Sequence, residues 1–230
     1  MRIQLQLTPN TAPVPFNYQH LLYERLEQWL GEYNLWHDNQ RLYCFGGLHK
    51  GHGYKGALTF PDGANWFLSG IDKTYLKYTI ERLLADPELI AGMKITHAEL
   101  QPPPQFGKRH SFFLSSPVLL KESKTRNNFP QFITYRDGNA ADRLLKKSLQ
   151  EKLEEAGRGE LQGSFRIRFS RNYPRPKTKL ITLRRKNGTT EKNRASLCPV
   201  EMTGPPEALQ LAWSVGVGES TGMGFGALLK

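Results

Sequence analysis

Hydrophobic residues follow two different periods along the first hundred residues of this chain. Ile3, Leu5 and Leu7 alternate with polar residues, which is the period of a strand with one buried side. Leu22 and Leu26 lie four residues apart, as on the buried side of a helix. The two periods and the turn residues between them predict a strand over 3–7, a helix from 17 to about 30, strands near 42–45, 57–60 and 66–69, a helix from 72 that ends at 86–87, and a strand near 93–100. We interpret this succession as the β-α-β-β-α-β order of a ferredoxin-like unit.

A proline-rich stretch from Gln101 to Gly107 separates this half from a second one. The pattern beyond it predicts a strand over 110–120, an extended piece near 131–135, a helix over about 140–156, a strand at 165–169, a basic strand at 179–185 with a hairpin turn at 186–189, and a terminal strand over 226–230. This half also fits a ferredoxin-like unit. We therefore predict an α+β fold of two tandem ferredoxin-like domains, residues 1–101 and 110–230, joined by a linker at 102–109.

The formal net charge of +11 is concentrated in one segment of the second half. Between Arg158 and Arg194 there are twelve lysines and arginines but only two glutamates, so this segment carries a net charge of +10. Charge gathered in this way is typical of a surface that binds a polyanion, and we expect nucleic acid rather than a membrane. No stretch approaches the ~18 apolar residues that a spanning helix needs. The two distant cysteines indicate neither a disulfide framework nor a zinc site and fit a reducing cytoplasm.

The strands of the basic segment predict a cationic hairpin. Ile167 and Phe169 alternate with Arg166 and Arg168, so one side of this strand belongs to the core and the other is charged. A basic ribbon with Tyr173 among its cations can straddle a groove or follow a single strand of nucleic acid. The residues that we predict to bind RNA here are Arg166, Arg168, Arg171, Arg175, Lys177, Lys179, Arg184, Arg185 and Lys186.

Five glycines fall within the eleven residues from Gly216 to Gly226. A loop of this kind can direct several backbone N–H groups at one phosphate, and we predict this role for Gly216, Gly218, Gly222 and Gly224. A dinucleotide-binding fingerprint is excluded by context, because that motif must open a long helix and only a few residues follow here. A glycine-rich turn that lets two strands pack is the structural alternative.

Four motifs resemble one known family. They are the loop VGVGESTGMGFG at 215–226, PFNYQ at 15–19, WHD at 36–38 ahead of LYCF, and FFLSSPV at 112–118. The loop is similar, nearly residue for residue, to the glycine-rich loop of the RAMP-superfamily endoribonucleases that cut CRISPR precursor RNA within its repeats. The other motifs resemble the entry to that family's first helix, its histidine ahead of a strand, and the first strand of its second domain. The resemblance implies metal-independent cleavage by 2′-OH transesterification, which leaves a 2′,3′-cyclic phosphate and a 5′-OH end.

The resemblance also assigns the catalytic residues. His37 is the candidate general acid or base, because the pKa of histidine lies near neutrality. Arg41 stands where some family members have a lysine, and it can stabilise a phosphate but is a poor proton donor. At the position of a tyrosine that some members use on the first helix, this chain has Glu27, and neither Tyr23 nor Tyr33 aligns with it.

Other histidines stay open as the acid or base. His49 and His52 lie in a glycine-rich turn with Lys50 and Lys55, and His20 lies on the first predicted helix. The two turn histidines have no carboxylate or cysteine nearby, so they make a weak metal site.

The resemblance identifies CRISPR repeat RNA as the partner and implies no metal and no cofactor. It places the protein in a prokaryotic cytoplasm. Further CRISPR-associated subunits and a homodimer both remain open as partners. The alternative function is that of a non-catalytic RNA-binding subunit of the same superfamily, which holds guide RNA in an interference complex.

Overall fold

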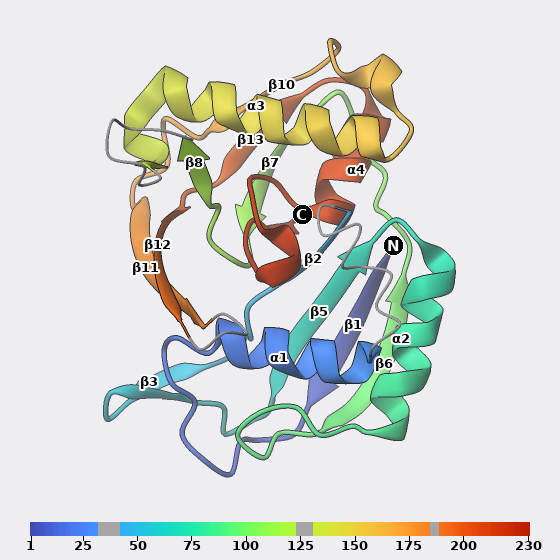
Figure 1. The fold of residues 1–230 in the computed structure, drawn as a ribbon, viewed down its shortest axis with the longest axis vertical. Coiled ribbons are helices and arrows are strands. Elements are labelled where there is room, and N and C mark those ends of the chain that lie inside the picture. Colours follow the sequence, from blue (N-terminus) through green and yellow to red (C-terminus); the bar gives the residue numbers. More distant parts are fainter. Residues whose placement is uncertain (32–41, 123–130, 185–188) are drawn as a thin grey trace.

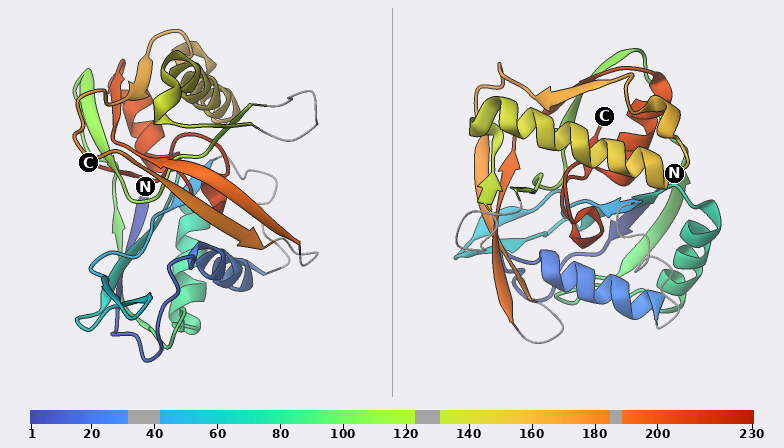
Figure 2. Two further views of the ribbon diagram at one scale, coloured as in Figure 1. Left: turned by 90° about the vertical axis from the view of Figure 1, so that its left-hand side faces the viewer. Right: turned by 45° about the horizontal axis from the view of Figure 1, so that its top comes forward.

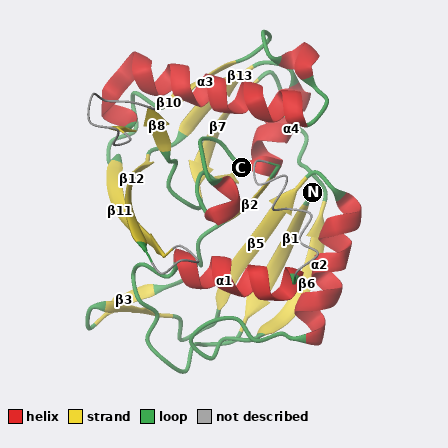
Figure 3. Cartoon of the chain, viewed as in Figure 1, coloured by secondary structure: helices red, strands yellow, loops and turns green. Residues whose placement is uncertain are grey.

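Two four-stranded antiparallel sheets form the framework of the molecule (Figures 1 and 3). The computed structural model describes residues 1–31, 42–122, 131–184 and 189–230. The first sheet has the order β2-β5-β1-β6 and consists of β1 (Arg2–Leu7), β2 (Tyr43–Phe45), β5 (Ala64–Gly70) and β6 (Ile95–Gln101). Its connections carry the helices α1 (Gln19–Leu30) and α2 (Lys73–Ala85).

The second sheet repeats this arrangement. It has the order β10-β13-β7-β14 and consists of β7 (Arg109–Leu114), β10 (Arg166–Phe169), β13 (Val200–Thr203) and β14 (Leu228–Leu229). The helices α3 (Gly138–Glu155) and α4 (Pro206–Val215) lie in its connections. In both sheets the first strand along the chain lies between the third and the fourth, which is the ferredoxin-like order. The boundaries of independently folding domains stay a prediction.

Each unit carries an additional hairpin in the same connection, between its second and third strands. In the first unit this hairpin is β3 (His52–Tyr54) with β4 (Ala57–Thr59), and in the second it is the longer pair β11 (Lys177–Arg184) and β12 (Thr190–Leu197). Figure 1 shows both hairpins on the left of the molecule, with β3 below the lower end of β11 and β12.

The helices cover one face of each sheet and enclose a separate core there. Leu22 and Leu26 of α1 pack with Trp66 in the first core, and Leu145 and Leu149 of α3 belong to the second. Side chains four residues apart on a helix share one side, which explains why the hydrophobic pattern located these helices. None of the helices within the described residues is long and apolar enough to cross a membrane.

The predicted strand over 110–120 is wrong in its second half. β7 ends at Leu114, and β8 (Leu120–Glu122) forms a separate two-stranded sheet with β9 (Gln131–Ile133). The backbone N–H of Ser115 still donates to Ala227 O at 2.9 Å, but Pro117 has no N–H to donate. Val118 instead pairs with Ser196 on β12. The chain therefore leaves the sheet at this proline and joins the hairpin.

A buried arginine lies between the two units. Arg2 is 2% exposed, and its guanidinium stacks 3.7 Å from the ring centroid of Phe67 and 3.8 Å from that of Trp213. Its Nη2 donates to Trp213 O at 3.1 Å and to Leu228 O at 2.8 Å. Burial lowers the pKa of this guanidinium to about 10. Arg2 thus connects the first strand of one sheet to the last helix and last strand of the other unit.

Candidate nucleic-acid interface

The glycine-rich loop follows α4 and packs between the two units. Gly216, Gly218 and Gly224 have φ of 73°, 79° and 84°, values that side chains other than glycine rarely adopt. A Cβ on Gly222 would lie 2.6 Å from the ring of Tyr43, and one on Gly224 would lie 2.5 Å from the ring of Phe45. All four predicted glycines are buried. Close contact with the aromatic side chains of β2 therefore explains Gly222 and Gly224 without a ligand.

Many backbone groups of the loop already have partners inside the protein. The N–H groups of Gly216 and Glu219 donate to Ala212 O and Leu119 O, both at 2.9 Å. The N–H of Gly224 donates to Thr221 O at 3.1 Å, and that of Gly226 to Pro117 O at 2.9 Å. Between Gly216 and Gly226, Glu219, Ser220 and Met223 are half-buried and the other residues are buried. The phosphate-binding role of the glycines stays a prediction, and these paired N–H groups are not available for it.

Side chains from helices of both units hold the loop through its carbonyl groups. Gln19 at the start of α1 donates from Nε2 to Gly224 O. On α3, Ser148 Oγ donates to Gly218 O at 2.7 Å, and Lys152 Nζ donates to Gly216 O at 3.1 Å. Lys152 is only 1% exposed. Figure 1 shows the loop, in dark red, between α3 and α1. The loop is therefore a fixed element that both helices position.

A cavity of about 680 Å³ lies between α3, β8 and this loop. Three of its cations are paired with carboxylates: Lys121 with Glu191 at 2.7 Å, Arg143 with Glu122 at 2.5 Å, and Lys147 with Glu151 at 3.9 Å. The exposed ion pairs of Arg143 and Lys147 contribute little to the free energy of unfolding. A phosphate can therefore replace the carboxylate partner of either cation with little loss of stability. The cavity is consequently a polar depression of mixed charge beside the loop.

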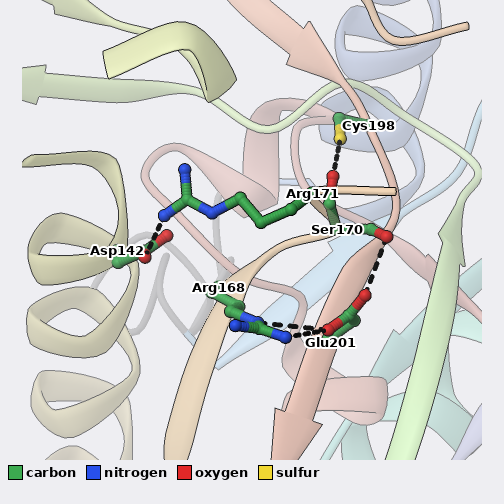
Figure 4. A network of polar contacts seen from close by, with 6 residues as sticks. All are labelled: Asp142, Arg168, Ser170, Arg171, Cys198 and Glu201. Atoms are coloured by element: carbon green, nitrogen blue, oxygen red, sulfur yellow. Dashed lines mark hydrogen bonds and ion pairs between the residues drawn. The ribbon is translucent and has the colours of Figure 1, made fainter. Parts of the chain in front are cut away.

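The arginines of β10 lie on the charged side of its strand, as the alternation predicts. Ile167 and Phe169 are buried, while Arg166 and Arg168 are exposed. Arg168 pairs with Glu201 on β13 at 2.8 Å, and the Ser170 hydroxyl donates to the same carboxylate at 2.8 Å (Figure 4). The Ser170 hydroxyl and the Arg168 guanidinium hold the pKa of Glu201 below its ordinary value.

The next arginine is also paired. Arg171 lies beside α3, where its Nη2 is 2.5 Å from an oxygen of Asp142 (Figure 4). Its side chain nevertheless stays 41% exposed, and that of Arg168 stays 52% exposed. Both arginines can therefore still approach an anion from solvent.

The β11–β12 hairpin has an inner and an outer side. Lys179, which we predicted to bind RNA, lies on the same side of β11 as the buried residues Ile181 and Leu183. It is half-buried, and burial lowers its pKa. Arg175 lies just before β11 and Lys177 is the first residue of β11, and both side chains are exposed. Arg184 belongs to β11, while Arg185 and Lys186 lie outside the described residues, as does the side chain of Arg184. The predicted RNA-binding set of the hairpin therefore does not share one side.

Two exposed cations of β12 were missing from the predicted set. Lys192 pairs with Thr182 and Arg194 with Leu180, on the outer side of the ribbon. The alternation of Lys192 and Arg194 with the buried Asn193 and Ala195 was present in the sequence and could have revealed them.

The predicted catalytic residues His37 and Arg41 lie outside the described residues. The described chain on either side ends at Gly31, just after α1, and resumes at Leu42, just before β2. Tyr43 at the start of β2 contacts Gly222 of the glycine-rich loop. The segment that carries His37 and Arg41 therefore connects α1 with β2, and both of these elements contact the glycine-rich loop.

One tyrosine of α1 lies beside the glutamate that occupies the family's tyrosine position. The side chain of Tyr23 is hydrogen-bonded to Glu27, one turn further along the helix. Burial and this carboxylate raise the pKa of Tyr23 to about 12. Sequence alignment alone gave no reason to connect the two residues, whereas their four-residue spacing on a helix does. Tyr33 lies outside the described residues.

The other histidines occupy different environments. His49 is half-buried, its Nε2 lies 2.6 Å from Ser115 Oγ, and burial followed by the charge of Arg2 lowers its pKa. His52 is exposed on β3. His20 lies on α1 next to Gln19, and its Nδ1 is buried without a hydrogen-bond partner among the described residues. In the same part of the chain, no group of three or more His, Cys, Asp or Glu side chains is arranged to hold a metal ion.

Comparison with known proteins agrees with this architecture. The family model for the C-terminal part of CRISPR-associated protein Cas6 matches residues 100–229. A structure described as a Cas6-related gene product from Pyrococcus furiosus is 21% identical, with a TM-score of 0.81 over 100% of this chain and 97% of that one. A RAMP protein described as binding different RNA substrates is 21% identical, with a TM-score of 0.81 over 100% of both chains. A Cas6 product complex is 15% identical, with a TM-score of 0.63 over 99% of both chains.

No curated protein sequence matches the chain. The likeness to solved structures extends over the whole chain and confirms the predicted α+β fold of two tandem ferredoxin-like units.

Proposed function

The chain belongs to the Cas6 family of CRISPR-associated proteins, and on this premise we propose that it is a metal-independent endoribonuclease that cuts precursor RNA within CRISPR repeats. Its family membership assigns it a role in processing CRISPR repeat RNA. One observation in the molecule carries the more specific proposal. The glycine-rich loop is held by Gln19 of α1 on one side and by Lys152 of α3 on the other, and it packs against Tyr43 of β2, the strand that follows the segment with His37.

The proposed reaction needs no group outside the protein and the RNA. A ribose 2′-OH attacks the adjacent phosphorus, and the bond between phosphorus and the 5′-oxygen breaks. The 2′-OH loses its proton to a general base, and the leaving 5′-oxygen receives a proton from a general acid. The products are a 2′,3′-cyclic phosphate and a 5′-OH end. His37 transfers a proton as general base or general acid, and Arg41 stabilises the additional negative charge of the transition state. Tyr23, hydrogen-bonded to Glu27, is the candidate for the second proton-transfer group.

RNA binding is proposed for the surfaces around the loop. The exposed cations of β10 and of the β11–β12 hairpin supply phosphate contacts, and the hairpin reaches α1 through Asn17, whose side chain bonds the backbone of Thr182 in both directions at 2.7 and 3.1 Å. The hairpin and the first helix therefore form one continuous border of the site. Whether further CRISPR-associated subunits or a second copy join the protein stays a prediction.

Incubation of a repeat transcript with the protein in EDTA tests the proposal. We expect cleavage at one position and a 2′,3′-cyclic phosphate end, and a single 2′-deoxy substitution at the cut should abolish it. His37→Ala should lower the cleavage rate by about 10²- to 10⁴-fold while the affinity for the transcript stays within about twofold. Loss of cleavage in EDTA would contradict the mechanism.

The alternative is a non-catalytic subunit that holds guide RNA. It is favoured by Glu27 at the position where some members of the family use a tyrosine, and by Arg41 where some use a lysine. In that case the native protein binds the transcript as tightly as His37→Ala does but never cuts it, with or without added metal.

A further inference from the structure

The β3–β4 hairpin presents an aromatic and basic tip to solvent. Tyr54 is 60% exposed, the highest value among the large hydrophobic side chains of the described residues. The Nζ of Lys55 lies 5.1 Å from its ring centroid. The sequence from His49 to Thr59 contains Lys50 and Lys55 and no acidic residue. This tip is therefore cationic as well as aromatic.

The hairpin is a firmly attached structure. Val14, ahead of α1, forms an isolated β-bridge with Leu58 of β4 through backbone hydrogen bonds of 3.0 and 2.8 Å. The next residue after β4, Phe60, is fully buried in the first core, and its N–H donates to Asn10 Oδ1 at 2.6 Å. Tyr54 therefore lies at the end of a hairpin that is fixed to the first unit, and its exposed ring belongs to no hydrophobic core of the described residues.

Two lysines of this hairpin region have a left-handed backbone conformation, which lysine rarely adopts. Lys55 and Gly56 have φ of 46° and 78°, the two left-handed residues of a tight hairpin turn. Asparagine or glycine is the preferred first residue of such a turn. Lys50, at the entrance to the hairpin, also has a left-handed φ of 75°. Non-glycine residues with a left-handed φ are strained, and such positions cluster at ligand-binding sites, so Lys50 and Lys55 are candidates for contact with a ligand.

A second exposed aromatic residue joins this tip to the basic hairpin of the other unit. Phe16 is 51% exposed and lies between Val14, which pairs with β4, and Asn17, which bonds Thr182 of β11. The outer side of β11 and β12 continues the surface with Leu180, which is 51% exposed, and with the cations Lys192 and Arg194. Figure 2 (left) shows both hairpins on the face turned to the viewer, with the β3–β4 hairpin at the lower left and the β11–β12 hairpin extending to the right.

We propose that the β3–β4 hairpin is a second RNA-binding finger, in which Tyr54 and Phe16 stack on unpaired bases while Lys50 and Lys55 contact the flanking phosphates. We call these four residues the stacking tip. Its hairpin occupies the same connection of the first unit that the basic β11–β12 hairpin occupies in the second. Single-stranded RNA fits because aromatic rings stack only on bases that are free of a duplex, and because the surrounding charge is positive. The inference rests on the proposed function only in naming RNA as the ligand.

Fluorescence anisotropy with the full-length protein tests this inference. The probes are a repeat RNA with a 2′-deoxy nucleotide at the cut position and a 15-nucleotide oligouridine. Tyr54→Ala should weaken binding of both by about 5- to 100-fold, the range expected for one stacked base, whereas Tyr54→Phe should bind as the native protein does. Leu84→Ala is the matched control, because Leu84 is 55% exposed on α2, outside the hairpin.

Lys55→Asn separates an RNA contact from a structural role. Asparagine suits the left-handed turn better than lysine, so the melting temperature should stay equal or rise while RNA affinity falls. Unchanged affinity of Tyr54→Ala and Lys55→Asn would overturn the proposal. It would also be overturned if the native protein were a dimer that Tyr54→Ala dissociates without loss of RNA affinity, because the tip would then bind a second copy.

The outcome is independent of catalysis. If the native protein binds the probes but cuts no repeat RNA, a loss of binding in Tyr54→Ala still supports the stacking tip and only the proposed nuclease activity fails. If repeat RNA is cut normally and Tyr54→Ala binds normally, the stacking tip fails and the proposed function stands.

Discussion

Individual residues of the glycine-rich loop are constrained by their neighbours to an unusual degree. Gly222 and Gly224 lie against the rings of Tyr43 and Phe45, and Gly218 lies against Leu119 and Val118. Each contact leaves no space for a Cβ, and four of the five glycines of the loop, all except Gly222, also have a left-handed φ that is strained for other residues. The motif that identifies the family is thus first a packing motif.

Gly224→Ala should be strongly destabilising. Its φ of 84° combines backbone strain with overpacking, because the added Cβ would lie 2.5 Å from the ring of Phe45, so we expect a loss of about 2–4 kcal/mol in the free energy of unfolding. Urea denaturation followed by circular dichroism measures it. Gly107→Ala is the matched control, since nothing lies within 4 Å of its Cβ position, and a change of more than about 1 kcal/mol there would undermine the comparison.

At the scale of elements, alternation along the strands predicted which side chains face solvent on β10 but not along the whole hairpin. Arg166 and Arg168 lie on the charged side as expected, whereas Lys179 turns toward the inner side of β11. The reason is that β11 leaves the sheet and packs on Leu119 and Phe225, a contact between distant segments that composition does not reveal. Charge density in the sequence therefore indicated which segment is basic, and the register of the β11–β12 hairpin determines which of its cations are exposed.

The polar network between β10 and β13 should make stability depend on pH. The pKa of Glu201 is lowered in the folded protein, so its carboxylate stabilises the fold above its ordinary pKa of 4.5, and this contribution disappears as the pH falls through the lower folded value. At pH 7 we expect the free energy of unfolding of the native protein to be about 0.5–1 kcal/mol higher than that of Glu201→Gln. The difference should shrink below pH 4.5 in parallel urea titrations. A difference that stayed constant down to pH 3 would contradict this account.

The outer cations of β12 should contribute to RNA affinity through phosphate contacts. Replacing Lys192 and Arg194 together by serine removes two contacts, so the slope of log affinity against log salt should become less steep by about 1.4 for single-stranded RNA. Lys179→Ser is the comparison on the inner side and should change the slope by less than about 0.3. Equal effects of both changes would show that the two sides of the ribbon are equivalent.

At the scale of the whole molecule, the two ferredoxin-like units could be predicted because each encloses its own core with its own hydrophobic periods. The way they join could not. Cys44, Phe67 and Ala227 form a small apolar cluster between the units, and Arg2 stacks beside it on Phe67 and Trp213. An arginine at the second position of a sequence gives no sign of burial, because arginine is mostly exposed in proteins. Contacts across more than two hundred residues decide its environment.

Arg2→Met should loosen the junction. It leaves the carbonyl groups of Trp213 and Leu228 without their donor and removes two cation–π contacts, so we expect a loss of about 2–3 kcal/mol in the free energy of unfolding. Arg2→Lys should recover only part of this, because an ammonium cannot reproduce the planar stacking of a guanidinium. Differential scanning calorimetry measures both variants, and an Arg2→Met protein as stable as the native one would contradict the role assigned to Arg2.

The position of Arg2 has a consequence for synthesis on the ribosome. Its hydrogen-bond acceptors lie up to 226 residues further along the chain, so β1 and β5 are both translated long before Trp213 and Leu228. Until those residues are translated, the guanidinium of Arg2 lacks both of these carbonyl acceptors and one of its two aromatic partners. In the folded protein the same guanidinium is buried between the two units and hydrogen-bonded to Trp213 and Leu228 of the second. The contacts of Arg2 between the two units can therefore form only after α4 and β14 have been translated.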